Sequence, residues 1–517
     1  MTNLVEFRVT CFNLRILSFS FLILFSSFFF FLLSFLFSLF FLSSSFSSFL
    51  PFSSFLLFSL SSFFLHFFWF LHPLFFPSYF PLLPPSLLLF CFFPLPFSFT
   101  MDSLVTANTK FCLDLFQELN KGDEPANIFV CPLSISVAFG MISLGAKGST
   151  ADQINEVLHF NEVSQNKSKE PKISSKGKSQ EDQGDQQKTS EPSNTQNTTS
   201  LSDGYKDSDS YFGNLLKKLD RIKCDYTLSM ANRLYGEQEF PICPAYSDNV
   251  MEFYHTTIES VDFQKDTEKS RQQINFWVEC QTQGKIKDLF DKDNITDSTV
   301  LVLVNAVYYK AKWEKSFDHE KTEDSPFWVN KNEQKSVKMM RQQSTFKIGY
   351  IEELKTQILE MNYIKGKLSM FVLLPEDFTG MEELEKNMTH EKITEWTSPT
   401  IMCEENVDIS FPQFTMESNL DLNAILQKMG ITDVFEEGKC DLRGISSSPN
   451  LYLSKAVHKT FLEVNEDGTQ AAAATGTVVT TKSASPYVAF NANHPFLFFI
   501  RENKTNTILF YGKVYSP

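Results

Sequence analysis

The chain has 517 residues, 21% of them charged, and a formal net charge of −15 at pH 7. This acidic balance argues against a nucleic-acid-binding surface, which requires clustered basic residues. The sequence also has no Walker A, HExxH, paired CxxC or GxSxG pattern, so nothing indicates a phosphate loop, a zinc site or a hydrolase nucleophile.

Residues 1–100 form a low-complexity segment dominated by Phe, Leu, Ser and Pro, and residues 16–100 contain no Asp, Glu, Lys or Arg. Its apolar stretches approach the ~20 residues of a transmembrane helix, whereas a signal peptide would be shorter. Neither explains so narrow a composition, but Phe, Leu, Ser and Pro are the amino acids that all-pyrimidine codons encode. We therefore expect a gene-model artefact, with Met101 as the true start. A genuine membrane anchor is the alternative, and the lack of flanking charge clusters speaks against it.

From Met101 the sequence predicts an amphipathic helix with no hydrophobic signal region. Its apolar residues Phe111, Leu115, Phe116 and Leu119 fall on one helical face. Seven cysteines follow Met101, an odd number without the spacing of a disulfide framework, so reduced thiols are expected. We therefore predict a cytoplasmic protein, with extracellular release open only by a route without a cleaved signal peptide.

Residues 163–210 are predicted to be a disordered loop between two helices. The segment is rich in Ser, Lys, Glu, Gln, Asn and Asp and nearly lacks large apolar residues. Such a composition cannot bury enough apolar surface to offset the entropy of ordering the chain. Two interpretations of this segment remain open. It is either a neutral insertion, or a docking or crosslinking segment that uses its many Gln and Lys side chains.

The segment 465–483 is the most informative for function. An acidic turn contains Glu466 and ends at Gly468, and small uncharged side chains follow it. These are Thr469, Gln470, Ala471, Ala472, Ala473 and Ala474. An alanine run usually favours helix, but Gly468 and the β-branched residues 478–481 argue against a continued helix. Small residues of this kind could enter a β-sheet with little steric cost.

A single basic residue marks the end of this segment. Lys482 is the only Lys or Arg between Lys459 and Arg501. A protease with a basic-specific pocket would therefore find one cleavable bond there, Lys482–Ser483.

Five motifs in the second part of the chain resemble the serpin family and occur in that family's order. They are residues 127–135, 305–313, 429–435, 454–459 and 490–500. The resemblance covers residues 101–517 and implies one α+β domain with the serpin fold: three β-sheets, eight to nine helices and an exposed reactive-centre loop. The start at Met101 is similar to the ovalbumin-type branch, clade B, whose members lack a cleaved signal.

The resemblance implies a serine protease inhibitor rather than an enzyme. In that scheme a trypsin-like protease attacks Lys482 and forms an acyl-enzyme, and the loop from Gly468 onward then inserts into a sheet as a new strand. Counting from Glu466, which fits the family's fixed point, also places the scissile bond after Lys482. The implied partner is that protease, held covalently by a monomer, and no nucleic acid, membrane, metal or cofactor is expected. The alternative is a non-inhibitory serpin with a binding or chaperone-like role, which the small, uncharged hinge disfavours.

Four further residues carry roles that the resemblance implies. Ser134, Asn305 and His458 match the family's shutter, which would hydrogen-bond across strands that must part. Trp313 matches the tryptophan of the breach, where insertion begins. Cys131 departs from the family's usual serine, and because a thiol is a weak hydrogen-bond partner, we expect a looser shutter.

Overall fold

The computed structural model describes residues 99–517 apart from 123–124, 166–200, 221–225, 379 and 470–485. Its ten α-helices in these ranges are α4 (Phe99–Leu119), α5 (Pro132–Gly145), α6 (Gly148–Val157), α7 (Phe160–Gln165), α8 (Leu201–Asp220), α9 (Pro244–Tyr254), α10 (Thr267–Gln281), α11 (Gly380–Asn387), α12 (His390–Trp396) and α13 (Leu422–Met429). The count exceeds the expected eight to nine because short helices are separate: α6 and α7 are divided near His159, whose φ of 58° is not helical. None of the helices in these ranges has both the length and the apolar character needed to cross a bilayer.

Fifteen strands form two hydrogen-bonded sheets in the described ranges. The first sheet contains β2 (Tyr226–Glu237), β3 (Ile258–Val261), β4 (Leu301–Lys312), β10 (Phe414–Asp421), β11 (Lys455–Val464) and β12 (Gly468–Thr469). The second contains β1 (Ile128–Val130), β5 (Glu323–Asn330), β6 (Glu333–Ile351), β7 (Thr356–Asn362), β8 (Leu368–Pro375), β9 (Cys403–Pro412), β13 (Val488–Asn491), β14 (Phe496–Glu502) and β15 (Thr507–Val514).

The long strand β6 joins two groups of strands into the second sheet. It pairs with β9 along Met339–Ile348 and with β7 along Lys347–Ile351. The order on one side is β1-β15-β14-β8-β7, while β9 and β13 lie on the other. Strand β5 pairs with the first part of β6, on the edge opposite β9, because Met339 pairs with both β5 and β9. Together with the first sheet this gives three strand groups, and the predicted α+β serpin fold is confirmed.

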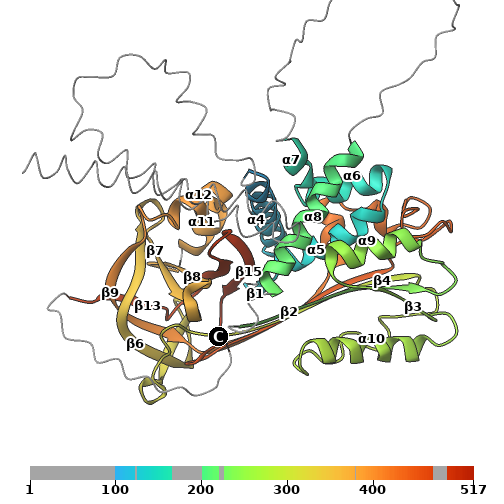
Figure 1. The fold of residues 1–517 in the computed structure, drawn as a ribbon. Helices are drawn as coiled ribbons and strands as arrows, with labels where there is room; N and C mark the ends of the chain where they lie inside the picture. Colours follow the sequence, from blue (N-terminus) through green and yellow to red (C-terminus); the bar gives the residue numbers. More distant parts are fainter. Residues whose placement is uncertain (1–98, 123–124, 166–200, 221–225, 379, 470–485) are drawn as a thin grey trace, which may run out of the picture. The chain divides into compact units, whose positions relative to one another are not determined.

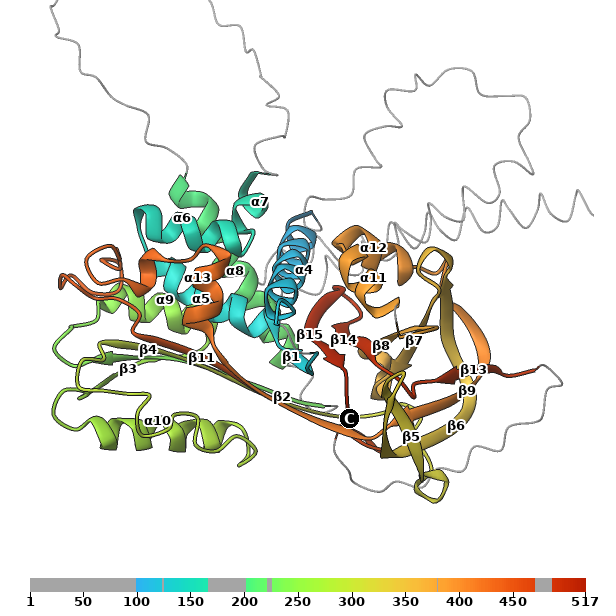
Figure 2. The same ribbon diagram turned by 180° about the vertical axis from the view of Figure 1, so that it is seen from behind.

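The first sheet is covered on both faces, which explains its sequence. Helices α5, α8 and α9 lie over one face and α10 over the other (Figures 1 and 2). In the central strand β4, Val302 and Val304 pack in a cluster with Ile274 of α10, whereas Leu303 belongs to the main core. Because both faces are buried, residues 301–309 are apolar on both faces instead of alternating, with Asn305 as the one strongly polar exception.

The predicted amphipathic helix is present as α4. Phe111, Leu115 and Phe116 are buried in the main core and Leu119 packs against it. The motif at 127–135 forms β1 and the start of α5, where Pro132 occupies the first turn and lacks only an N–H that would be unpaired there.

Of the predicted loop 163–210, residues 166–200 lie outside the described residues, whereas both of its ends belong to helices. The chain continues as α7 to Gln165 and resumes as α8 at Leu201. Helix α8 is held by the buried side chains Phe212, Leu215 and Leu219, whose spacing places them on one face.

Asp209 joins α8 to α9 through a buried hydrogen bond. It is 5% exposed and accepts a bond of 2.5 Å from the Tyr254 hydroxyl. Burial raises the pKa of Asp209 to about 7, although the bond from Tyr254 acts in the opposite direction. The folded protein therefore holds a proton here that the unfolded chain releases above about pH 4.

We expect this proton to make stability fall as pH rises. Between about pH 4 and pH 7 the folded state binds more protons at this site than the unfolded state, so the free energy of unfolding decreases, by up to roughly 4 kcal/mol. Urea unfolding at pH 5 and pH 8 should show a smaller decrease for Asp209→Asn than for the unmodified protein. Asp248→Asn, at an exposed position of α9, should leave the decrease unchanged. Equal decreases in all three proteins would contradict the assignment.

Candidate functional site

The first sheet opens where β4 and β11 stop pairing. The two strands are parallel neighbours from Val302 opposite Lys455 to Tyr308 opposite Phe461. Beyond this point β12 pairs with β4 instead, antiparallel, with Gly468 opposite Lys312 and Thr469 opposite Ala311. A segment that continued along β4 in this direction would enter between β4 and β11.

A tight turn connects β11 to β12. The Asn465 N–H donates to the Gly468 carbonyl at 2.8 Å, and the Gly468 N–H donates to the Asn465 carbonyl at 3.1 Å. Gly468 has a φ of 136°, and a Cβ there would lie 2.3 Å from the Ala311 carbonyl oxygen. Only glycine fits, because both the backbone conformation and the close approach to β4 exclude a side chain.

The main chain of the acidic turn is bonded to the segment after β4. The Trp313 N–H donates to the Asp467 carbonyl and the Phe317 N–H to the Glu466 carbonyl, both at 2.9 Å. Trp313 also donates from Nε1 to the Asn465 carbonyl at 3.0 Å, while its indole stacks on Tyr363 with ring centroids 4.6 Å apart. The predicted breach tryptophan therefore lies directly against the start of the loop.

The two carboxylates of the turn are nearly buried and have partners that the sequence reasoning missed. The Thr322 hydroxyl donates to Glu466 Oε1 at 2.6 Å. The His319 ring lies 3.5 Å from both Glu466 Oε2 and Asp467 Oδ2. No local pattern could have indicated these partners, because they come from a segment more than 140 residues earlier.

A polar network crosses three strands beneath this opening. His458 Nδ1 lies 2.5 Å from Asn305 Oδ1, and Asn305 Nδ2 donates to the Ser134 carbonyl at 2.7 Å and to the Ser134 hydroxyl at 3.0 Å. Asn305 lies opposite His458 in β11 on one side and opposite Asn232 in β2 on the other. The structure therefore brings Ser134, Asn305 and His458 together, all of them fully buried.

Asn232 is a fourth member of this network that was not predicted. It accepts a hydrogen bond from the Ser134 hydroxyl at 3.2 Å and donates one to the Ser134 carbonyl at 3.4 Å. Its position opposite Asn305 becomes apparent only once the register of β2 is known.

Comparisons with known proteins agree with this geometry. The family model described as Serpin (serine protease inhibitor) matches residues 106–517. The chain belongs to the serpin family. Its fold is that of a serpin.

Curated relatives and solved structures place this serpin among clade B members. Serpin B12 of Homo sapiens is 64% identical over 421 residues, which cover 81% of this chain and 100% of that protein. Leukocyte elastase inhibitor of Equus caballus is 39% identical over 421 residues, with the same coverage. Among solved structures, uncleaved ovalbumin is similar with a TM-score of 0.67 and 35% identity, covering 80% of this serpin and 100% of that chain.

The protonation state of the network in this serpin follows from its bonds. His458 Nε2 accepts a hydrogen bond from the Cys131 N–H at 3.1 Å, so Nδ1 carries the ring hydrogen and donates it to Asn305. Burial lowers the pKa of His458 to about 3, and the ring therefore stays neutral under physiological conditions. A neutral ring with one donor and one acceptor satisfies both of its neighbours.

The expected weakening of the shutter by Cys131 does not arise at this contact. Cys131 bonds to His458 through its backbone N–H, a group that serine would also supply. Burial raises the pKa of the Cys131 thiol to about 12, so the side chain remains a neutral, apolar-like group in the core.

The reactive bond and most of the hinge lie outside the described residues. Lys482, Ser483 and residues 470–474 belong to this part, and of Thr469 only the backbone is described. Their roles remain predictions. Glu466, Gly468 and Trp313 are described, and they meet at the C-terminal end of β4.

Replacing Gly468 by alanine is expected to displace the turn from β4. A Cβ at this position requires both a strained backbone and a shift of β4, at a cost of about 1–3 kcal/mol. The amides of Trp313 and Phe317 should then exchange with deuterium at least about fivefold faster, because their acceptors lie in the turn.

A second glycine provides the matched control. Gly438 also has a positive φ, 80°, but an added Cβ there would meet no atom within 4 Å. Gly438→Ala should therefore leave exchange of the two amides unchanged. If both variants accelerate them equally, the close approach to β4 is not what holds the turn.

Proposed function

We propose that this serpin inhibits trypsin-like serine proteases as a suicide substrate cleaved at Lys482–Ser483. The observation that carries the proposal is the pairing of β12 with β4, because a strand extended from Thr469 along β4 would enter between β4 and β11. The relative named leukocyte elastase inhibitor supports an inhibitory role for this family branch. The protein is then a substrate and trap, not a catalyst.

The proposed chemistry begins as ordinary proteolysis. The hydroxyl of the protease's catalytic serine attacks the Lys482 carbonyl, and the Ser483 nitrogen takes a proton and leaves as a free amine. The protease is now joined to Lys482 by an ester. Hydrolysis of this ester would release cleaved serpin and active protease, so inhibition requires a faster competing event.

That event is insertion of the freed loop as a new strand. Residues 469–474 carry small, uncharged side chains. As an added strand they would alternate between the two faces of the sheet, both of which helices cover. Insertion satisfies the main-chain groups of the loop and draws the attached protease along the sheet. The shutter residues Ser134, Asn305 and His458 must exchange partners during this step, since β4 and β11 have to separate.

Specificity in this proposal comes from Lys482. A lysine side chain complements the acidic primary pocket of trypsin-like enzymes. We further propose residues 101–517 as the serpin domain, acting as a monomer in the cytoplasm without cofactor or metal. Coverage of the whole human relative by 81% of this chain supports that boundary.

The test is incubation of recombinant residues 101–517 with trypsin, followed by a denaturing gel and mass spectrometry. The expected product is an SDS-stable species at the summed mass, with a released fragment that begins at Ser483. Cleavage at this bond without a complex, and with full protease activity, would instead make the protein a substrate-like or non-inhibitory serpin.

A further inference from the structure

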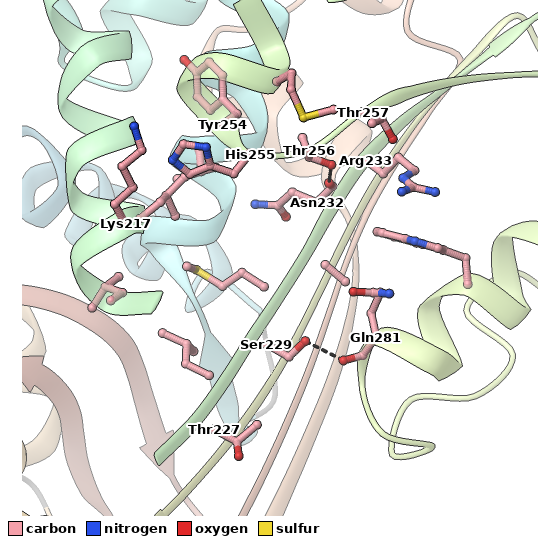
Figure 3. Close-up of a pocket in the computed structure, with 18 of the residues that line it drawn as sticks. Lys217, Thr227, Ser229, Asn232, Arg233, Tyr254, His255, Thr256, Thr257 and Gln281 are labelled. Carbon is pink, nitrogen blue, oxygen red and sulfur yellow. Dashed lines mark hydrogen bonds between the residues drawn. The ribbon is translucent and has the colours of Figure 1, made fainter. Parts of the chain in front are cut away.

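A cavity of about 810 Å³ lies at the outer edge of β2, away from the opening between β4 and β11. Its walls come from both faces of the sheet. Lys217 and His255 line it on one side of β2, and Arg233 and Gln281 on the other (Figure 3). The cavity therefore surrounds the edge of the strand, and its volume is in the range of natural ligand sites.

The main chain of β2 is open along this edge. On its inner side β2 pairs with β4 from Tyr226 to Gly236, but on its outer side β3 pairs only with residues 234–237. Among the described residues, no strand pairs with the outer side of residues 227–233. Open edges of this kind are templates for another strand, and proteins usually cover or charge them.

The direction of the edge groups follows from one side-chain bond. The Thr256 hydroxyl donates to the Asn232 carbonyl at 2.6 Å, so the main-chain groups of Asn232 point outward. In an antiparallel pair this orientation repeats at every second residue. The N–H and C=O groups of Leu228 and Met230 therefore point outward too, into the cavity that these residues line.

The charge of the cavity is opposite to that of the protein. Among the described residues, its lining includes Lys217, Arg233 and His255 but no Asp or Glu, although the chain carries a net charge of −15. Lys217 is exposed in the last turn of α8. The Arg233 guanidinium lies 4.2 Å above the centre of the Trp277 ring and 3.5 Å from Glu259, which leaves part of its donor set available.

We propose that the open edge of β2 binds an extended acidic segment of a partner protein by strand addition. The added strand would bond to the main chain of Leu228 and Met230. Successive side chains of a strand point to opposite faces, so two adjacent acidic residues would reach Lys217 on one face and Arg233 on the other. This site is independent of the reactive bond, so the inference does not rest on the proposed inhibition.

The test uses the purified protein and a fluorescein-labelled octapeptide in which pairs of glutamate alternate with pairs of β-branched residues. Fluorescence anisotropy should show binding that weakens with salt and falls about fivefold in Lys217→Glu. Lys428→Glu is the matched control, because Lys428 is also exposed in the last turn of a helix, α13. Equal losses in both variants would overturn the proposal.

The main-chain contribution is tested separately. A peptide of the same sequence, N-methylated at every second residue, keeps its charge but cannot donate along one edge. It should bind at least tenfold more weakly, and the unmethylated peptide should protect the Leu228 and Met230 amides from hydrogen exchange. Equal affinity of the two peptides, or displacement of both by a sulfated polysaccharide without amide protection, would identify a general polyanion surface and overturn strand addition.

Discussion

Replacing Thr469 by arginine is expected to abolish trapping of trypsin while cleavage at Lys482 continues. Thr469 is the first residue after the turn at Gly468, and its backbone is already paired with Ala311 of β4. Helices cover one face of this sheet and α10 lies on the other, so the inserted loop must place its side chains in protein interior on alternate sides. A guanidinium buried without a partner costs several kcal/mol.

This cost acts on a competition between two rates. If insertion slows while hydrolysis of the acyl-enzyme does not, each 1.36 kcal/mol shifts the ratio about tenfold towards release. We therefore expect the yield of SDS-stable complex to fall at least tenfold in Thr469→Arg, with a released fragment that still begins at Ser483. Thr469→Ala is the matched control and should trap normally. A Thr469→Arg variant that traps as well as the unmodified protein would show that this residue does not enter the sheet.

Replacing Lys482 by glutamate should nearly eliminate the reaction with trypsin. An acidic side chain would face the acidic primary pocket of the protease, so an attraction is replaced by repulsion between like charges in a desolvated site. We expect the rate constant for complex formation to decrease by at least about 10³, equivalent to roughly 4 kcal/mol.

A lysine outside the loop controls for the change in net charge. Lys504 is exposed in the turn between β14 and β15, and Lys504→Glu changes the net charge by the same amount. Its rate should differ from that of the unmodified protein by no more than a few-fold, through long-range electrostatics alone. Complex formation that survives in Lys482→Glu, with a fragment starting at another residue, would reassign the reactive bond.

Local spacing and composition were sufficient to predict several elements. The helical period of Phe111, Leu115 and Phe116 identified the buried face of α4. Gly468 was expected to end the acidic turn and to argue against a continued helix, and it has a φ that other residues rarely adopt. These features depend on neighbours within a few residues, so the sequence carries them directly.

Other features depended on which distant segments the fold brings together. The sequence indicated Ser134, Asn305 and His458 but not Asn232, because strand register alone decides that Asn232 lies opposite Asn305. It raised a concern about the thiol of Cys131, yet the contact uses a backbone N–H whose direction is set by the start of α5.

The partners of the acidic turn and the open edge of β2 also depend on which distant segments the fold brings together. His319 and Thr322 reach Glu466 across more than 140 residues. In the described part of the chain, β3 pairs with residues 234–237 of β2 and no strand pairs with the outer side of residues 227–233. The sequence by itself therefore determined the family, the buried face of the helix α4 and the reactive bond that we propose. The tertiary structure decided how the turn before the loop is held and where the binding edge that we propose lies, because hydrogen bonds between distant strands depend on register and on main-chain direction, and local residue order determines neither.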